Sequence, residues 1–338
     1  MLRNSRNVNC PSPPAHFCAL GFQSPPQNPR PGAGGFVNLQ AHAKINLYLD
    51  VVGKRPDGYH DIVSVMQSVG LCDDLHISCN GTQQLSMTCS DPSLPTDETN
   101  LVVMAARLLI DKYKIQHPVH IELTKRVPVG AGLAGGSSDC AATLRGINEL
   151  FQLNISMDEL VEIGRTLGAD VPFCLMGGTA LAQGIGERLT PLPPHPPCHI
   201  VLAMPGIHVA TAEVYARLNL VKKSIAGHTS DTRGLSSLKN ALANGDVSRI
   251  AASFYNAFTP ITAGMHPEIS DILTEFRVCG ALGASMSGTG SAVFAYFDNE
   301  NYARRACNRL SNYKFSNNGL KTYATSLTQP TQPYLGKE

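Results

Sequence analysis

Hydrophobic and polar residues alternate through the segment AHAKINLYLDVV, residues 41–52, as they do in a half-buried β-strand. Apolar side chains occupy the odd-numbered positions from Ile45 to Val51, and polar side chains occupy most of the even-numbered ones. Successive side chains of a strand point to opposite faces, so we expect Lys44 and Asn46 on a common side. The pattern therefore predicts a strand that presents an amine and an amide together.

The same two periodicities predict the remaining elements. Folded sequence begins near Phe36, Asp57-Gly58 makes a turn after the first strand, and Ser156 with Glu159 forms a helix capping box. Further strands are predicted at residues 63–71, 74–80, 119–128 and 200–206. Helices are predicted at residues 100–113, 137–151, 156–167, 211–218, 247–254, 268–276 and 300–310. This mixture of strands and helices indicates an α/β or α+β architecture.

Five prolines fall within the nine residues PLPPHPPCH, residues 191–199, which neither a helix nor a central strand accommodates. The cluster predicts a boundary between an N-terminal domain, residues 36–190, and a C-terminal domain, residues 195–328. Residues 1–35 contain seven prolines and no acidic residue, which predicts a disordered extension. A flexible tail is expected at residues 329–338.

Composition narrows the class of protein. The 338 residues carry a formal net charge of +1, with 43% hydrophobic and 16% charged residues. That balance is typical of a globular protein and predicts no nucleic-acid or membrane partner. The ten cysteines show no zinc-type spacing and are expected as reduced thiols. No apolar run reaches the roughly 18 residues that cross a bilayer. We expect a soluble cytoplasmic protein of bacterial type. If the acid-free N-terminal segment is a transit peptide, the expected location is instead the plastid stroma. A misassigned start site is the third interpretation of this segment.

A glycine-rich loop opens directly into a predicted helix in the segment GAGLAGGSSD. Its G-x-G-x-x-G at Gly130, Gly132 and Gly135 is a weak signal shared by several nucleotide binders. A dinucleotide fold would need an acidic residue at the end of the next strand, but Glu149 falls inside the helix. A P-loop would need a Gly-Lys-Ser ending, which is absent here. The pattern favours backbone amides and a helix N-terminus that bind phosphate, with a purely structural turn as the alternative.

Four segments closely resemble, in order, segments of the GHMP superfamily of small-molecule kinases. They are AKINLYLDVVGKRPDGYHDI, VPVGAGLAGGSSDCAATL, LGADVPFCLMGGTALAQGIGERLTPL and SGTGSAVFA. The resemblance covers about residues 40–325 and implies a two-domain fold, α/β followed by α+β, with the active site in the cleft between the domains. It also implies a kinase that uses ATP and Mg²⁺ to phosphorylate an alcohol. The first and third segments are most similar to the branch that acts on a cytidine diphosphate-linked alcohol, as a monomer or homodimer.

The resemblance assigns roles to individual residues. Asp170 matches the catalytic base, and Lys44 matches the lysine that orients it and stabilises the developing alkoxide. The ATP-binding positions are Lys125, Pro128, Val129, Gly130, Ala131, Gly132, Leu133, Ala134, Gly135, Gly136, Ser137 and Ser138. The substrate-binding positions are Asn46, Tyr59, His60, Tyr215, Gly288 and Gly290. No protein carboxylate is expected to bind Mg²⁺, which the ATP phosphates would hold together with Ser138.

Other interpretations stay open at this point. Asp170 fits a helix N-cap and Lys44 a solvated strand residue. Homoserine or mevalonate kinase is the nearest rival activity, and a non-catalytic regulator or nucleic-acid-binding protein of the same fold is a rival from another class. One departure from the family pattern is His42, where the family usually has proline, and we expect it to affect the start of the strand more than the chemistry.

Overall fold

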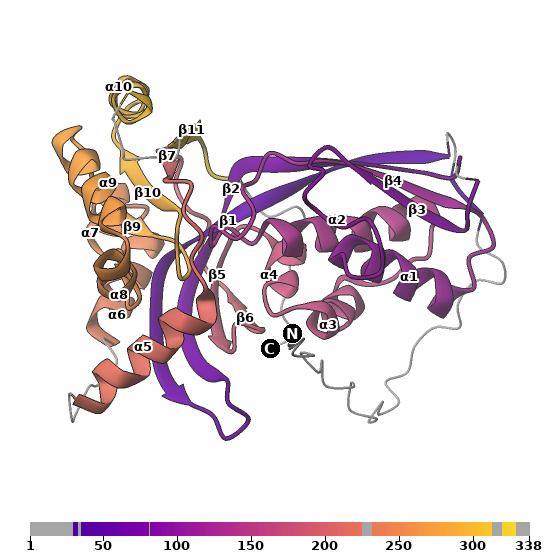
Figure 1. Ribbon diagram of the computed structural model, residues 1–338, viewed down its shortest axis with the longest axis horizontal. Helices are drawn as coiled ribbons and strands as arrows, with labels where there is room; N and C mark the ends of the chain where they lie inside the picture. Colours follow the sequence, from indigo (N-terminus) through magenta and orange to yellow (C-terminus); the bar gives the residue numbers. More distant parts are fainter. Residues whose placement is uncertain (1–29, 33–34, 81, 225–231, 313–319, 329–338) are drawn as a thin grey trace, which may run out of the picture.

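Two long strands form the spine of the molecule (Figure 1). The structure is a computed structural model and describes residues 30–32, 35–80, 82–224, 232–312 and 320–328. Strand β1 (Phe36–Lys54) pairs antiparallel with β2 (His60–Ser78) along its whole length. The predicted extension at residues 1–35 and tail at residues 329–338 fall almost entirely outside the described residues.

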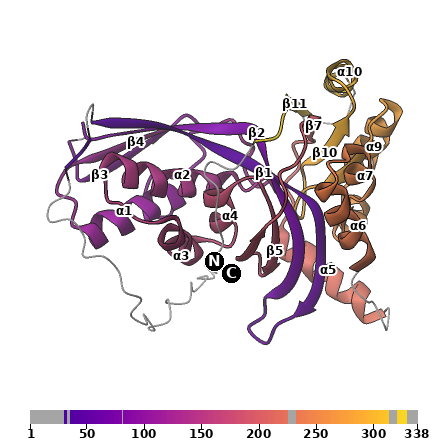
Figure 2. The ribbon, with the colours of Figure 1, turned by 180° about the vertical axis from the view of Figure 1, so that it is seen from behind.

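The first sheet has seven strands in the order β3-β4-β2-β1-β8, with β5 pairing β2 and β6 pairing β5. Its further strands are β3 (Leu85–Cys89), β4 (Val119–Thr124), β5 (Thr179–Gly184), β6 (Arg188–Pro191) and β8 (Tyr255–Asn256). Four helices cover one face (Figures 1 and 2): α1 (Leu101–Tyr113), α2 (Gly135–Leu150), α3 (Met157–Leu167) and α4 (Val171–Met176). One hydrophobic core lies between these helices and the sheet.

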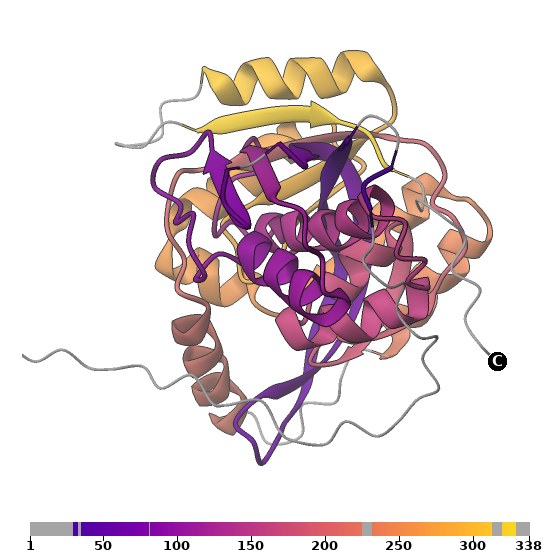
Figure 3. The ribbon, with the colours of Figure 1, turned by 90° about the vertical axis from the view of Figure 1, so that its right-hand side faces the viewer.

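A second sheet of four strands has the order β11-β7-β10-β9. Its strands are β7 (His199–Met204), β9 (Gly283–Met286), β10 (Val293–Phe297) and β11 (Lys321–Thr325). Its helices are α5 (Thr211–Ser224), α6 (Thr232–Ala243), α7 (Val247–Ala252), α8 (Thr259–Met265), α9 (Pro267–Val278) and α10 (Glu300–Ser311). Helix α10 lies alongside β11 (Figure 3), and a bridge between Val69 and Leu327 ties the segment after β11 back to β2.

The predicted mixed α/β class is confirmed, with one correction in β2. Residues 63–71 and 74–80 were expected as two strands, but they form one. Residue 42 pairs with Cys72 and Lys44 pairs with Ser68, so the three residues around Gly70 face only Ala43. A β-bulge at residues 69–71 thus lies next to the expected break at residues 72–73, and β1 pairs with the strand on both sides of it.

A second correction concerns β1 itself, which was expected to be half-buried. Every residue from Ala43 to Val51 is buried, because the second sheet packs on one side of it. Ile45 and Leu47 share a core with Ile200 and Leu202 of β7. The alternation in the sequence thus separates an apolar face of β1 from a polar face with Lys44 and Asn46, and both faces are buried.

The predicted helices agree with the structure, and three further helices, α4, α6 and α8, were not predicted. Helix α1 begins after Asn100, whose side chain accepts from the Val102 amide, and the Ser156 side chain caps α3. Helices α4 and α8 were missed because six or seven residues show no helical period. None of the helices in the described residues is long and apolar enough to span a membrane.

The proline cluster carries the chain from the first sheet to the second, since β6 ends at Pro191 and β7 begins at His199. Within it His195 is only 3% exposed, and its ring packs edge-on against Tyr296 at 5.4 Å between centroids. The Nδ1 atom hydrogen-bonds to the Pro196 carbonyl at 2.7 Å. Nε2 has no hydrogen-bond partner in the part of the chain that the structure describes. The domain boundary proposed for this segment stays a prediction.

We expect acid to destabilise the fold through His195. Burial lowers its pKa to about 4, against an ordinary value of 6.5. Below pH 6.5 the unfolded chain binds a proton at this position that the folded chain rejects, so the free energy of unfolding falls by roughly 3 kcal/mol between pH 6.5 and 4. Urea unfolding at several pH values measures the slope of the free energy of unfolding against pH. His195→Leu should remove that part of the slope, whereas the exposed His199→Leu should keep it; an unchanged slope in His195→Leu contradicts the assignment.

Candidate active site

A cleft of about 630 Å³ opens where β1, the glycine-rich loop and the second half of the chain meet. Its walls include Lys44, Asn46, Asp170, Tyr215 and Gly288. They come from four separate parts of the chain, namely strand β1, the start of α4, helix α5 and the turn between β9 and β10. The fold therefore gathers most of the predicted site residues around one space.

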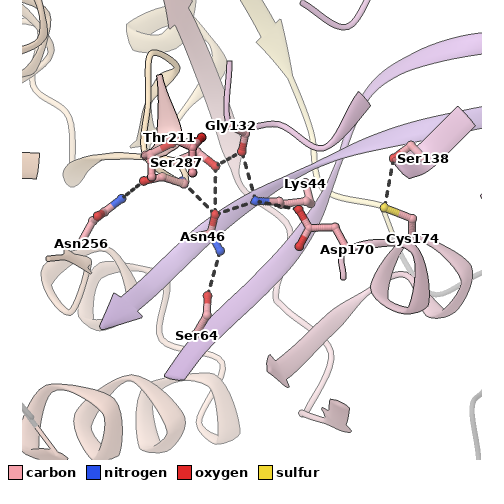
Figure 4. Close-up of polar contacts among 12 residues, drawn as sticks. Lys44, Asn46, Ser64, Gly132, Ser138, Asp170, Cys174, Thr211, Asn256 and Ser287 are labelled. Atoms are coloured by element: carbon pink, nitrogen blue, oxygen red, sulfur yellow. Dashed lines mark hydrogen bonds and ion pairs between the residues drawn. The ribbon is translucent and has the colours of Figure 1, made fainter. Parts of the chain in front are cut away.

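Lys44 and Asp170 point toward each other inside this cleft (Figure 4). Their Nζ and Oδ2 atoms are 3.7 Å apart, with the Lys44 side chain 5% exposed and that of Asp170 32% exposed. The Lys44 ammonium also donates to the Asn46 amide oxygen at 2.8 Å and to the Gly132 carbonyl at 3.1 Å. A buried amine fixed by three oxygens is not a solvated strand residue.

Asp170 occupies the N-cap position of α4, yet its side chain caps nothing. Its φ and ψ of −87° and −12° are those of the right-handed helical region, whereas capping residues usually adopt extended values. The carboxylate is therefore available to the cleft, and its nearest cation is Lys44. The site therefore places a carboxylate and an ammonium side by side at the cleft.

Asn46 connects three segments of the site. Its Oδ1 accepts from the Gly288 amide at 2.9 Å as well as from Lys44, and its Nδ2 donates to Ser64 Oγ at 2.8 Å on β2. The amide thus ties β1 and β2 to the turn between β9 and β10. The sequence prediction that Lys44 and Asn46 share a face is confirmed by their direct hydrogen bond.

The glycine-rich loop owes its shape to left-handed backbone at Gly130 (φ 69°), Gly132 (φ 80°) and Ala134 (φ 57°). A Cβ on Gly132 would lie 2.3 Å from the Ser287 carbonyl oxygen, so only glycine fits there. The loop leads into α2 at Gly135, where the first amides of the helix have no acceptor within the helix. Such amides and the helix dipole make a site for phosphate oxygens.

Nearly all of the predicted loop positions line the cleft, namely Pro128, Val129, Gly130, Ala131, Gly132, Ala134, Gly135, Gly136 and Ser137. Leu133 instead is buried in the core, where its carbonyl accepts from the Lys44 amide at 3.0 Å. Ser138 also departs from the prediction, because its hydroxyl donates to the His42 carbonyl at 2.5 Å and contacts Cys174 at 3.3 Å (Figure 4). It joins α2 to β1 and does not line the cleft.

Lys125 lies in the wall of the cleft, although its ammonium is held by two carboxylates. Nζ lies 2.5 Å from Asp73 and 2.7 Å from Asp139. Burial alone would lower the pKa of Lys125, but Asp139 and Asp73 outweigh that effect and the net shift is upward. The lysine therefore keeps its charge beside the glycine-rich loop.

Aromatic side chains stack at another part of the site. The rings of His60 and Tyr215 are 4.8 Å apart, and Tyr215 packs edge-on against Phe258 at 4.7 Å. Burial, with a smaller contribution from Asp170, raises the pKa of Tyr215 to about 12. Tyr215 and Phe258 line the cleft and His60 does not, while Tyr59 is 61% exposed near the β1–β2 turn and also lies outside the lining. His60 and Tyr215 thus come together, while Tyr59 lies outside their stack.

Sequence reasoning missed several residues that shape the site. The Ser287 hydroxyl donates to the Gly132 carbonyl at 2.9 Å, and Asn256 Nδ2 donates to the Met286 and Gly288 carbonyls at 2.7 and 2.8 Å. Ser287 thus holds the turn that contains Gly288 and Gly290 against the glycine-rich loop, and Asn256 holds the same turn to β8. Ser287 could have been found from its place in SGTGS, whereas Asn256 has no local signal.

Comparison with known proteins agrees with this geometry. The family model described as GHMP kinases N terminal domain matches residues 100–178, and the one described as GHMP kinases C terminal matches residues 238–317. A protein of Exiguobacterium sibiricum named 4-diphosphocytidyl-2-C-methyl-D-erythritol kinase is 45% identical over 277 residues, 82% of this chain and 94% of that protein. The chain belongs to this kinase family. The first matched region of this GHMP kinase contains both the glycine-rich loop and Asp170.

Solved structures extend the comparison. A crystal structure of 4-(cytidine 5'-diphospho)-2C-methyl-D-erythritol kinase is 32% identical, with a TM-score of 0.71, and covers 86% of this kinase and 99% of its own chain. A homoserine kinase from Cytophaga hutchinsonii has a TM-score of 0.66 at 20% identity, over 93% of this kinase and 98% of that chain. At that identity the homoserine kinase supports the fold and not the substrate.

Proposed function

We propose that this kinase transfers the terminal phosphoryl group of ATP to the 2-hydroxyl of 4-diphosphocytidyl-2-C-methyl-D-erythritol, in the non-mevalonate route to isoprenoid precursors. The observation that carries the proposal is the Lys44–Asp170 pair, which faces the same cleft as the phosphate-binding loop. Phosphoryl transfer needs mainly positioning and charge stabilisation, with a base beside the attacking hydroxyl. This cleft offers both.

In the proposed reaction the substrate hydroxyl oxygen attacks the γ-phosphorus, and the bond from that phosphorus to the oxygen of ADP breaks. Asp170 accepts the hydroxyl proton. Lys44 orients Asp170 and stabilises the negative charge that develops on the attacking oxygen. The hydrogen bonds from Lys44 to Asn46 and Gly132 hold its ammonium at this position.

We assign ATP to the glycine-rich loop and the start of α2. Gly130 to Ser137 would surround the phosphates with backbone amides. Mg²⁺, which neutralises phosphate charge when bound, prefers few protein oxygens together with phosphates and water. The described ranges contain no group of three His, Cys, Asp or Glu side chains that could hold a metal ion. Ser137, which lines the cleft, takes the role first expected of Ser138.

For the substrate we assign the cytosine ring to the aromatic stack of His60 and Tyr215. A planar ring can stack there while the imidazole supplies a hydrogen bond. Gly288 and Gly290 would receive the diphosphate beside the loop. The same proposal includes three further points. The chain has two domains that meet at the proline cluster, and it forms a monomer or homodimer. Its location is the cytoplasm, with the plastid stroma as the alternative.

The decisive experiment measures ATP consumption with the purified protein and three alcohols. We expect turnover with 4-diphosphocytidyl-2-C-methyl-D-erythritol and at least about a thousandfold lower kcat/KM with homoserine and mevalonate, because these lack the ring that the stack would bind. Preference for homoserine or mevalonate contradicts the proposed substrate. No turnover with any alcohol contradicts the kinase activity itself.

A variant of the aromatic stack separates substrate recognition from chemistry. Tyr215→Ala should raise the KM for the cytidyl alcohol about tenfold or more and leave the KM for ATP within twofold, because only one substrate loses a stacking partner. The exposed Tyr302→Ala on α10 is the matched control and should change neither constant. Equal rises in both KM values would contradict the assignment of the stack to the cytosine ring.

A further inference from the structure

One buried carboxylate holds three successive residues at the start of the phosphate-binding loop. Asp73 on β2 has a fully buried side chain. Its Oδ1 accepts from the amides of Arg126 and Val127 at 2.5 and 2.8 Å, and its Oδ2 accepts from the Lys125 ammonium at 2.5 Å. These are the last residues before the loop begins at Pro128, so Asp73 fixes the point from which the loop departs.

The same lysine reaches the far end of the loop. Lys125 Nζ also donates to Asp139 Oδ2 at 2.7 Å, on the first turns of α2. Asp73, Lys125 and Asp139 thus form an ion bridge across the base of the loop. A Cβ on Gly135 would lie 3.3 Å from Nζ, so the ammonium lies directly against the first residue of α2. Both ends of the loop are held by one side chain.

The bridge is buried and carries an excess of negative charge. The side chains of Lys125 and Asp139 are 6% and 4% exposed, and Asp139 Oδ1 has no hydrogen-bond partner among the described residues. Burial, only partly offset by Lys125, raises the pKa of Asp139 to about 7. Removing Asp73 would leave Lys125 with one carboxylate, Asp139, in a poorly solvated place, and removing Lys125 would leave both carboxylates without their cation.

We propose that Asp73 is a positioning residue for ATP: through Lys125 and the amides of residues 126 and 127, it sets the spacing between the end of β4 and the start of α2, and with it the shape of the loop that receives the phosphates. Asp73 does not line the cleft and so acts through the residues that it holds. The inference rests on the proposed function, because it assumes that ATP binds this loop.

Asp73→Asn tests the proposal, and the chain supplies a matched control one residue away. The asparagine keeps the size but removes the charge and offers an N–H where the bridge needs an acceptor. We expect the KM for ATP to rise about 10- to 50-fold, with kcat lowered less than threefold and the KM for the alcohol within twofold. Asp74→Asn, whose 42% exposed carboxylate pairs with Arg126 at the surface, should match the wild type.

The pattern of constants separates positioning from a merely structural role. Partial unfolding lowers the active fraction, and therefore kcat, without a selective change in either KM. An ATP KM within twofold of wild type in folded Asp73→Asn, or equal rises in both KM values, overturns the proposal. If Asp73→Asn does not fold, Asp73→Glu replaces it, because it keeps the charge and changes the spacing, with the same selective rise expected and the same outcomes decisive.

A binding measurement keeps this inference apart from the identity of the alcohol. Calorimetric titration of the full chain with a non-hydrolysable ATP analogue should give a Kd that rises about 10- to 50-fold in Asp73→Asn and stays unchanged in Asp74→Asn. This result stands even if the wild type rejects the cytidyl alcohol. Equal affinity of Asp73→Asn and wild type for the analogue overturns the role of Asp73 while leaving the proposed activity intact.

Discussion

Replacement of Asp170 by asparagine is expected to lower kcat about a thousandfold, within the range that positioned general bases contribute. The asparagine keeps the shape of the carboxylate but cannot accept the hydroxyl proton, and Lys44 loses the anion that lies 3.7 Å from its ammonium. The KM for ATP should stay within threefold, because the loop amides and α2 are untouched. Steady-state kinetics with each substrate varied in turn measures both effects.

The control for this variant is an aspartate far from the cleft. Asp111→Asn, on the exposed face of α1, should keep wild-type constants. Thermal unfolding should also be nearly the same for Asp170→Asn and wild type, since the Asp170 side chain caps no helix. A fully active Asp170→Asn variant would remove the base from the proposed reaction, whatever the alcohol.

Local patterns were sufficient for the parts of the site that lie on one element. The alternation around Lys44 places the lysine and Asn46 on one face, and the hydrogen bond between them confirms it. The glycine-rich loop and the start of α2 were also predictable, because glycine spacing and helical period are both local. The meeting of Lys44 and Asp170, 126 positions apart, came only from the resemblance to a kinase family.

The other parts of the site depend on contacts between distant segments, which no local sequence pattern encodes. In the sequence Asp73 is one of two adjacent acidic residues, and nothing distinguishes it from Asp74. Only the fold buries Asp73 against the start of the loop, while Asp74 stays exposed. Ser138 and Ser137 are indistinguishable in the sequence, yet the helix turns one hydroxyl toward the His42 carbonyl and leaves the other at the cleft. The side of a helix that a residue occupies depends on packing, so the sequence could not tell which of the two hydroxyls lies at the cleft.

The two glycine-rich segments function as one unit, although they are more than 150 residues apart. Ser287 donates to the Gly132 carbonyl, the Ala292 amide donates to the Ala131 carbonyl at 3.0 Å, and Gly288 lies against Gly132. From β1, Lys44 donates a hydrogen bond to the Gly132 carbonyl, and Asn46 accepts one from the Gly288 amide. The phosphate-binding loop therefore depends on the second half of the chain for its shape, and a change at the contact should disturb both.

Gly132→Ala is expected to lower kcat/KM by about a hundredfold or more, because a displacement of 1 Å at a reacting centre can cost that much. The new Cβ would lie 2.3 Å from the Ser287 carbonyl oxygen and 3.2 Å from that of Gly290, and both are backbone atoms that yield only if the two segments separate. Separation would draw the Gly132 carbonyl away from Lys44. The left-handed φ of 80° adds about 1 to 2 kcal/mol of strain.

The chain contains a control that isolates the contact from the strain. Gly245 has a φ of 64°, but a Cβ there meets nothing within 4 Å, and the residue lies in the turn between α6 and α7. Gly245→Ala should therefore be destabilised only by the strain of its left-handed backbone and should keep full activity. We expect urea unfolding to show Gly132→Ala less stable than Gly245→Ala by roughly 2 kcal/mol, the excess coming from overpacking. Equal stability and activity in the two variants would mean that the loop and the turn are not held together as the structure has them.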